Sequence, residues 1–229
     1  MAKAALRRIV MGLASLIVLL GAAGVALGQE VPNRDPHGPP DVQSLIQSLM
    51  SDERVAELRP ERVIAELMLP EDAIVADLGS GPGVFTVPLA QELRRGVVYA
   101  VDVEPQQLDA LRQRLIEADL HNVVPVLASF STPHLPPAHL DLILLVDTYH
   151  HIEDRTEYFR HLRSVLRPGG RIAVIEYKAG ELPAGPPVEM KLPEGLREEE
   201  LRAAGFSLLR SFDIHEHHDF ELWVPSISF

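Results

Sequence analysis

A glycine-rich stretch, Asp77-Leu78-Gly79-Ser80-Gly81-Pro82-Gly83, constrains the fold of this chain more than any other. The apolar run at residues 73–78 predicts a fully buried strand, and apolar residues at helical spacing follow the glycines from Val84 onward. A strand, a glycine turn and a helix in this order favour ligand binding, because glycines allow positive φ and a helix start offers free N–H groups. A plain tight turn without a ligand is the alternative interpretation.

The glycine spacing narrows the choice of ligand. The pattern is G-x-G-x-G, and Val84 stands where the third glycine of a dinucleotide fingerprint would be, which disfavours an NAD-dependent dehydrogenase. With an acid two residues before the first glycine, the stretch resembles the first motif of class I S-adenosyl-L-methionine (SAM)-dependent methyltransferases. The resemblance extends over about residues 61–224 and implies SAM as the cofactor. It assigns the amino acid end of SAM to Asp77, Gly79, Ser80, Gly81 and Gly83.

The chain is acidic and contains no cysteine. Its 229 residues carry a net charge of −12, and since residues 1–28 contribute three positive charges and no acids, the remainder carries −15. Such a surface repels phosphate backbones, so we expect a small-molecule acceptor and no nucleic acid partner. The lack of cysteine excludes disulfides, thiolate metal ligands and cysteine nucleophiles.

Residues 1–28 have the pattern of an export signal. Three basic residues precede an apolar stretch at residues 9–27, and small residues suited to a cleavage site end it. The stretch is also just long enough for an uncleaved membrane anchor. Either interpretation predicts an exported domain, periplasmic or extracellular, or one anchored to the membrane by its N-terminus. An anchor in the opposite orientation, with the domain on the cytoplasmic face, is the third alternative. A Pro-rich linker at residues 29–41 then leads to one domain at residues 42–229.

Strand and helix patterns alternate after residue 73, which predicts an α/β fold. We expect a Rossmann-like doubly wound sheet that is mostly parallel and ends in a C-terminal antiparallel hairpin. The predicted strands are residues 73–78, 97–101, 123–127, 140–146, 171–176, 206–214 and 220–224. The predicted helices are residues 42–50, 61–69, 84–94, 105–118, 155–166 and 196–204. Pro168-Gly169-Gly170 predicts a turn after the helix at 155–166.

Two segments are candidates to cover a site. The resemblance implies that the helices within residues 42–69 close over the cofactor, although helices that cap one sheet edge fit the same pattern. Residues 178–193 form a long Pro-rich loop, which is a candidate lid or a loop without a role. The chain as a whole resembles bacterial methyltransferases of type 11 and type 25, and residues 185–192 resemble a loop of a group of uncharacterised bacterial SAM methyltransferases, where a histidine often stands at the position of Met190. That difference implies altered acceptor chemistry.

Ligands of doubly wound sheets bind at the carboxyl ends of the strands, so the residues that follow each strand are site candidates. Asp102 ends the second strand, 19 residues after Gly83, and a carboxylate there can accept from both ribose hydroxyls. Alternatively, Asp102 is an acid in the N-cap region of the helix that begins near Pro105 and binds no ligand. After the third strand, the resemblance implies that Ser129 bonds the adenine, where relatives often have an acid. Phe130 either stacks on the purine or belongs to the core.

The segment after the fourth strand carries the candidate catalytic residues. The resemblance implies that it faces the reacting methyl group, with Asp147 against the cofactor or the substrate. His150 titrates near neutrality and is a candidate base, and Tyr149 is a candidate pocket residue. A capped turn containing two structural histidines is the alternative interpretation. Glu176, at the end of the fifth strand, is a second candidate on the acceptor side.

The cluster His215-Glu216-His217-His218-Asp219 has two interpretations. His215 and His217 would share one face of a strand and could bind a metal, but a polar hairpin turn explains the cluster more simply, and we predict no metal site. Taken together, the sequence predicts a SAM-dependent methyltransferase that acts on a small molecule. The second hypothesis is an exported module that binds a nucleoside-like ligand without catalysis.

Overall fold

The computed structural model of the protein describes residues 41–183 and 185–226. The predicted signal or anchor at residues 1–28, and all of the predicted linker except Asp41, lie outside the described residues. In the described part, no helix is both long and apolar enough to cross a membrane.

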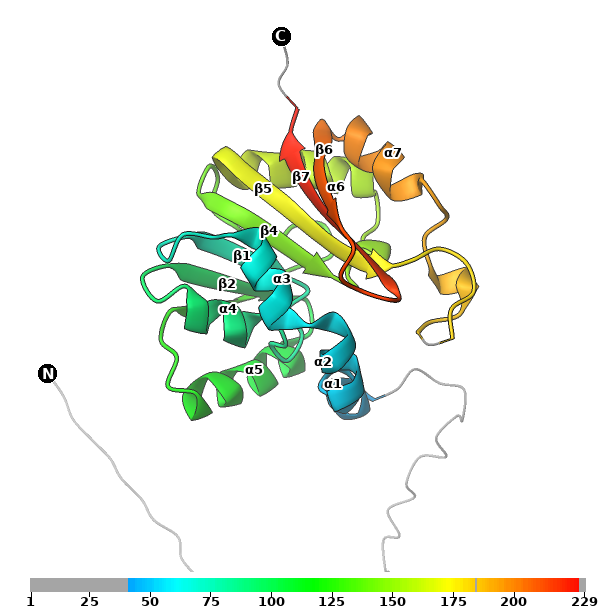
Figure 1. Cartoon of the computed structure of the whole chain (residues 1–229). Coiled ribbons are helices and arrows are strands. Elements are labelled where there is room, and N and C mark those ends of the chain that lie inside the picture. Colours follow the sequence, from blue (N-terminus) through cyan, green and yellow to red (C-terminus); the bar gives the residue numbers. More distant parts are fainter. Residues whose placement is uncertain (1–40, 184, 227–229) are drawn as a thin grey trace, which may run out of the picture. The chain divides into compact units, whose positions relative to one another are not determined.

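The centre of the domain is a mixed sheet (Figure 1). In the described residues it has seven strands in the order β3-β2-β1-β4-β5-β7-β6. The strands from β1 to β5 are parallel, and β7 runs antiparallel to both β5 and β6. This topology confirms the predicted doubly wound sheet with a C-terminal hairpin. The strands are β1 Ile74–Leu78, β2 Val97–Asp102, β3 Val123–Leu127, β4 Leu140–Val146, β5 Leu166–Tyr177, β6 Phe206–Phe212 and β7 His218–Pro225.

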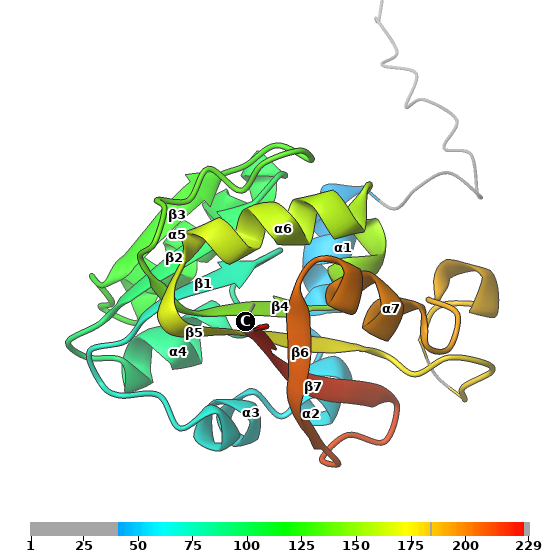
Figure 2. The same ribbon diagram turned by 90° about the horizontal axis from the view of Figure 1, so that it is seen from above.

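Helices cover both faces of the sheet, as Figure 2 shows. The side chains of β4 alternate between the faces: Leu142 and Leu144 pack with α3 and α4, whereas Ile143 and Leu145 pack with α6 and α7. Burial on both sides explains why the central strand is apolar at nearly every position. The helices are α1 Val42–Leu49, α2 Asp52–Leu58, α3 Pro60–Leu67, α4 Thr86–Glu92, α5 Pro105–Glu117, α6 Arg155–Val165 and α7 Leu196–Ala203, with short 3-10 turns η1 Tyr149–His151 and η2 Val188–Met190.

Two predictions about elements were wrong. We predicted no helix at α2, yet the Ser51 hydroxyl accepts from the amide of Arg54 at 3.4 Å and acids fill the first turn, so the helix is capped at its start. We also predicted a turn at Pro168-Gly169-Gly170. The helix α6 does end before it, but β5 already begins at Leu166, and an irregularity in its pairing with β4 accommodates the extra residues.

The carboxyl ends of β1 and β4 lie so close together that Gly79 has no room for a side chain. A Cβ on Gly79 would lie 2.2 Å from the Oγ1 of Thr148, and the φ of Gly79 is +76°. Gly169 has a similar φ of +82° but open space around it. A side chain at either position would strain the backbone, but only at Gly79 would it also clash with a neighbouring residue.

We predict that Gly79→Ala destabilises the fold more than Gly169→Ala. Both substitutions introduce left-handed strain of about 1–2 kcal/mol. Gly79→Ala adds about 1–3 kcal/mol of overpacking against Thr148. Urea unfolding of the two variants measures the difference, and equal losses of stability would contradict the close approach of β1 and β4.

Candidate functional site

A cavity of about 820 Å³ lies at the carboxyl ends of the parallel strands. Its volume is in the upper part of the range for small-molecule sites. Residues that follow β1, β2, β3, β4 and β5 all line it, and α1 contributes Leu45 and Leu49. Because the sheet order is β3-β2-β1-β4-β5, the cavity extends across the sheet edge from Ser129 to Tyr177.

The glycine turn forms one wall of this cavity and is bonded to the neighbouring strand. The amides of Gly79 and Ser80 donate to the carbonyl of Val101 at 2.8 and 3.0 Å. The amide of Gly81 donates to Oδ2 of Asp102 at 2.8 Å. Gly79, Gly81 and Gly83 have φ angles of +76°, +52° and +88°, so the turn uses the backbone freedom that the glycine spacing predicts.

Asp77 and Asp102 end adjacent strands and line the same cavity. Asp77 is buried, and its Oδ2 accepts from the hydroxyl of Thr86 at 2.6 Å. Burial raises the pKa of Asp77 to about 7 in spite of that hydrogen bond, and the charge of Asp102 adds to the rise. Burial also raises the pKa of Asp102, although the amides of Glu104 and Gly81 partly oppose it. The cavity therefore contains two carboxylic groups that a bound cation would help to ionise.

Ser129 and Phe130 line the cavity beyond β3. The Ser129 hydroxyl lies 3.2 Å from that of Ser131. The Phe130 side chain is 70% exposed, so the alternative that placed it in the core is wrong. The ring is thus available at the edge of the cavity.

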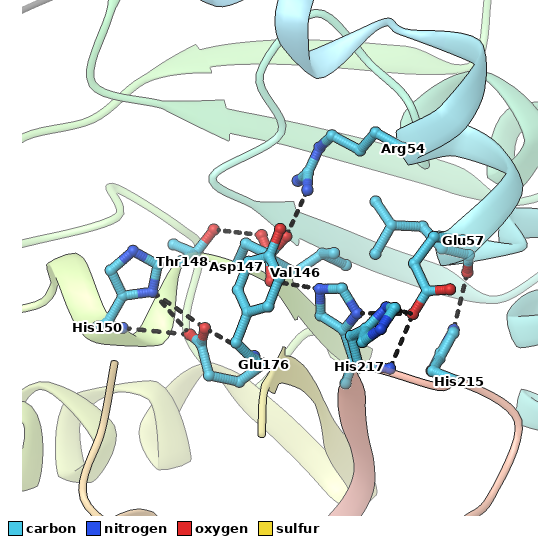
Figure 3. Close-up of polar contacts among 12 residues, drawn as sticks. Arg54, Glu57, Val146, Asp147, Thr148, His150, Glu176, His215 and His217 are labelled. Carbon is cyan, nitrogen blue, oxygen red and sulfur yellow. Dashed lines mark hydrogen bonds and ion pairs between the residues drawn. The ribbon is translucent and has the colours of Figure 1, made fainter. Parts of the chain in front are cut away.

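Asp147 is held by residues from distant parts of the chain (Figure 3). Its Oδ2 lies 2.6 Å from Nη1 of Arg54, and its Oδ1 lies 3.2 Å from Nε2 of His218. Burial alone would raise the pKa of Asp147, but His218 and Arg54 outweigh it and lower the pKa. Arg54 is a site residue that sequence reasoning missed, because it lies on the unpredicted helix α2.

His150 forms a pair with Glu176 at the β4–β5 end of the cavity (Figure 3). Nδ1 of His150 lies 3.1 and 3.0 Å from the two carboxylate oxygens of Glu176. Burial alone would lower the pKa of His150, but Glu176 outweighs it and raises the pKa. In the neutral imidazole, this contact assigns the proton to Nδ1 and makes Nε2 the acceptor. The neighbouring His151 has a lowered pKa because of burial and the charge of His150.

The structure does not place Tyr149 in the cavity, so that prediction was wrong. The η1 turn directs the ring into the core, where it is fully buried and packs 4.9 Å from the ring of Phe159. The hydroxyl donates to Oε2 of Glu200 at 2.9 Å. Burial and this carboxylate raise the pKa of Tyr149, so the residue supports the fold rather than the chemistry.

The histidine-rich segment at residues 215–218, which leads into β7, forms hydrogen bonds with α2. Nε2 of His215 lies 2.9 Å from the carbonyl of Leu58, and the amide of His217 donates to Oε1 of Glu57 at 3.0 Å. His218 lies between Glu57 and Asp147. Within the described residues, no group of three or more potential ligands is arranged to bind a metal.

Four buried polar atoms of residues that line the cavity have no hydrogen-bond partner within the described structure. One is Oδ1 of Asp147, which lies 3.2 Å from Nε2 of His218, and the other three are Oγ of Ser80, Oε1 of Gln107 and Nε of Arg54. A buried polar atom without a partner costs about 1–3 kcal/mol. Because all four belong to residues that line the cavity, a polar ligand such as SAM fits this wall. Gln107, near the start of α5, is a second residue that sequence reasoning missed.

The sheet is that of the class I methyltransferase fold, and the glycine turn and the paired acids lie at its ligand-binding edge. A family model described as a methyltransferase domain, Methyltransf_12, matches residues 76–172. This match supports the class and not the predicted type 11 or type 25 subgroup.

Comparisons over longer stretches agree with this class. A SAM-dependent methyltransferase of Aquifex aeolicus has a similar structure, with a TM-score of 0.75, 26% identity, and coverage of 81% of this chain and 98% of that chain. Aklanonic acid methyltransferase DauC of Streptomyces is 28% identical over 49% of this chain and 53% of its own length. Trans-aconitate 2-methyltransferase of Escherichia coli is 33% identical over 49% of this chain and 42% of its own length. The chain thus matches about half the length of these curated relatives.

We predict that Glu176→Gln lowers the pKa of His150. Glu176 stabilises the imidazolium, so the pair stabilises the fold below the ordinary histidine pKa, and this contribution is lost as the pH rises through the raised value. NMR titration of the His150 ring measures the change, with Glu181→Gln on the exposed loop as the control. A His150 pKa that is the same in Glu176→Gln and the wild type would contradict the pairing.

Proposed function

We propose that this protein transfers the methyl group of SAM to an oxygen atom of a small molecule. The observation that carries the proposal is the His150–Glu176 pair at one end of a cavity whose middle is the glycine turn. The distribution of polar groups along the cavity supports a cofactor at the β1–β3 end and an acceptor at the β4–β5 end. Methyltransferase activity on particular acceptors belongs to the relatives, and for this chain the acceptor is part of the proposal.

The proposed cofactor contacts follow the order of the strands. Ser129 and Phe130 would hold the adenine, and Asp102 would accept from the ribose hydroxyls. Asp77, with the turn formed by Gly79, Ser80, Gly81 and Gly83, would hold the methionine part, and Asp147 would lie beside it. The unpartnered atoms of Ser80, Gln107 and Arg54 support these contacts. Several carboxylates on one wall also favour a cationic ligand.

Methyl transfer from SAM needs few catalytic groups from the protein. When bound, SAM supplies an electrophilic methyl group, so the chain needs to position the acceptor and exclude water. Nε2 of His150 would accept the proton of the acceptor hydroxyl while Glu176 holds the ring through Nδ1. A module that only binds would not need this pair, and no observation favours the binding module over the enzyme.

The location of the domain is also a proposal. Residues 1–28 support an exported domain or one anchored through residues 9–27, and this rests on the sequence pattern alone. Fractionation of cells that produce the full chain with a C-terminal tag tests it. Tagged protein confined to the soluble cytoplasm would contradict it.

We predict that His150→Asn lowers kcat by about 10²–10⁴-fold and leaves SAM affinity unchanged, because the proton acceptor is lost but the cofactor wall is intact. The measurement follows label from methyl-tritiated SAM into a small-molecule extract, with calorimetry of SAM binding in parallel. Wild-type protein that binds SAM and labels no small molecule would contradict the enzymatic proposal.

We predict that SAM binding near pH 7 releases about half a proton, because Asp77 has a pKa of about 7 and a cation beside it lowers that pKa. Affinity for SAM then rises as the pH rises through this range. Calorimetry in buffers with different ionisation enthalpies measures the release, and Asp77→Asn should abolish it. A binding enthalpy that does not depend on the buffer would contradict the contact.

A further inference from the structure

We propose that the acceptor is an uncharged aromatic compound that carries a hydroxyl group. This inference deepens the proposed function and depends on it. It rests on the side chains that line the β4–β5 end of the cavity, on the pairing of every charged group there, and on the orientation of His150.

The acceptor end is separated from the cofactor end by the order of the strands. Ser129 and Phe130 follow β3 at one edge, whereas Tyr177 ends β5, three strands further along. The loop between β5 and α7 contributes Gly185, Pro186 and Met190 to this second end. A molecule that reaches His150 from this end therefore lies against the loop.

Apolar and aromatic side chains form this end of the cavity. They are Ile152, Tyr158, Tyr177, Pro186 and Met190. The Tyr177 ring is held firmly, since its centroid lies 4.1 Å from that of His218 and a Cβ on Gly185 would lie 2.5 Å from the ring. Fixed aromatic rings favour a flat partner, because offset and edge-to-face contacts need defined planes. Met190 is 56% exposed and adapts to ligands of different outline.

The charged groups at this end already have partners. Arg54 pairs with Asp147, and Glu176 pairs with His150. The Nζ of Lys178 donates to the carbonyl of Glu216 at 2.8 Å, away from the residues that line the cavity. Among the other described residues of the loop, Lys191 donates to the carbonyl of Gly180 and its Nζ lies 5.9 Å from the centroid of the Tyr177 ring, so this cation already has partners. Neither Lys191 nor Glu181 or Glu189 lines the cavity. A carboxylate or phosphate on the acceptor would lose its water without gaining a counter-ion, which is costly.

The available base fits a phenol better than an alcohol. His150 presents one nitrogen as an acceptor, and an imidazole removes a proton more readily when the pKa values are close. A phenol has a pKa of about 10, whereas that of water is about 15.7 and an aliphatic alcohol resembles water. Shape, charge and acidity thus point to the same class of acceptor.

The experiment compares two fluorescent probes that differ by one charge, 2-naphthol and 6-hydroxy-2-naphthoate. Each is titrated into the full-length protein loaded with S-adenosylhomocysteine (SAH), the demethylated product of SAM. Calorimetry first establishes that SAH binds, and failure of this step would reject the proposed function. We expect 2-naphthol to bind at least about tenfold more tightly than the carboxylate. Equal or tighter binding of the carboxylate, or binding of neither probe to the SAH-loaded protein, would overturn the acceptor class.

A pair of variants tests whether the preference for the uncharged probe arises at the acceptor end of the cavity. Met190→Lys introduces a cation at the acceptor end, and Met68→Lys introduces one at the C-terminus of α3, where the side chain is 73% exposed and does not line the cavity. Both positions are exposed enough to take lysine without burying the charge. We expect Met190→Lys to reduce the preference for 2-naphthol by about tenfold and Met68→Lys to leave it unchanged. An unchanged preference in Met190→Lys would overturn the placement of the acceptor.

Discussion

The hydrogen bond from the amide of Gly81 to the carboxylate of Asp102 is the contact on which the proposed site depends. It joins the turn after β1 to the end of β2, and the bonds from Gly79 and Ser80 to Val101 reinforce it. Parallel strands bring their carboxyl ends to one edge of the sheet, so this local bond sets the wall of a shared cavity. The Asp102 carboxylate can accept more than one donor at each oxygen, which leaves capacity for a ligand.

Segments far from the strand ends in the sequence, among them α1 and α2, form the rest of the cavity wall. The helix α2 contacts Asp147 after β4 through Arg54 and strand β7 through Glu57, and His218 lies between Glu57 and Asp147. The Arg54–Asp147 ion pair is largely buried, so removing one partner would leave an uncompensated charge. The wall formed by α1 and α2 is therefore held by charge where Arg54 meets Asp147, and α1 adds the apolar side chains of Leu45 and Leu49. The His150–Glu176 pair lies at the same end of the cavity, where the charge of Asp147 contributes to the raised pKa of His150.

The sequence predicts the fold well because each element carries a local signal. Buried strands such as β4 are continuous apolar runs, and the glycine turn has a spacing that differs from a dinucleotide fingerprint. The bounds of β3 and β4 agree with the prediction, whereas α4 is shorter at both ends than predicted. The helix α2 was not predicted because its apolar pattern is short. Ser51 and the acids that follow it are a helix-capping signal from which it could have been predicted.

The side-chain partners in the site could not be predicted from spacing. Arg54 meets Asp147 across 93 positions of sequence, and Glu57 meets His218 across 161. Such pairs depend on how helices fold back over the sheet. The direction of Tyr149 depends on the single turn η1, in which successive side chains point about 120° apart. Candidate residues at strand ends were recognisable, but their division between cavity and core was not.

The contact between Asp102 and the ribose is the most direct test of the account. We would measure the affinity of wild type and Asp102→Ala for SAH and for an analogue of SAH that lacks both ribose hydroxyls. The account predicts that wild type loses affinity for the analogue by about tenfold or more, and that Asp102→Ala binds both ligands equally well. The same loss in both proteins, or no binding of SAH to wild type, would contradict it.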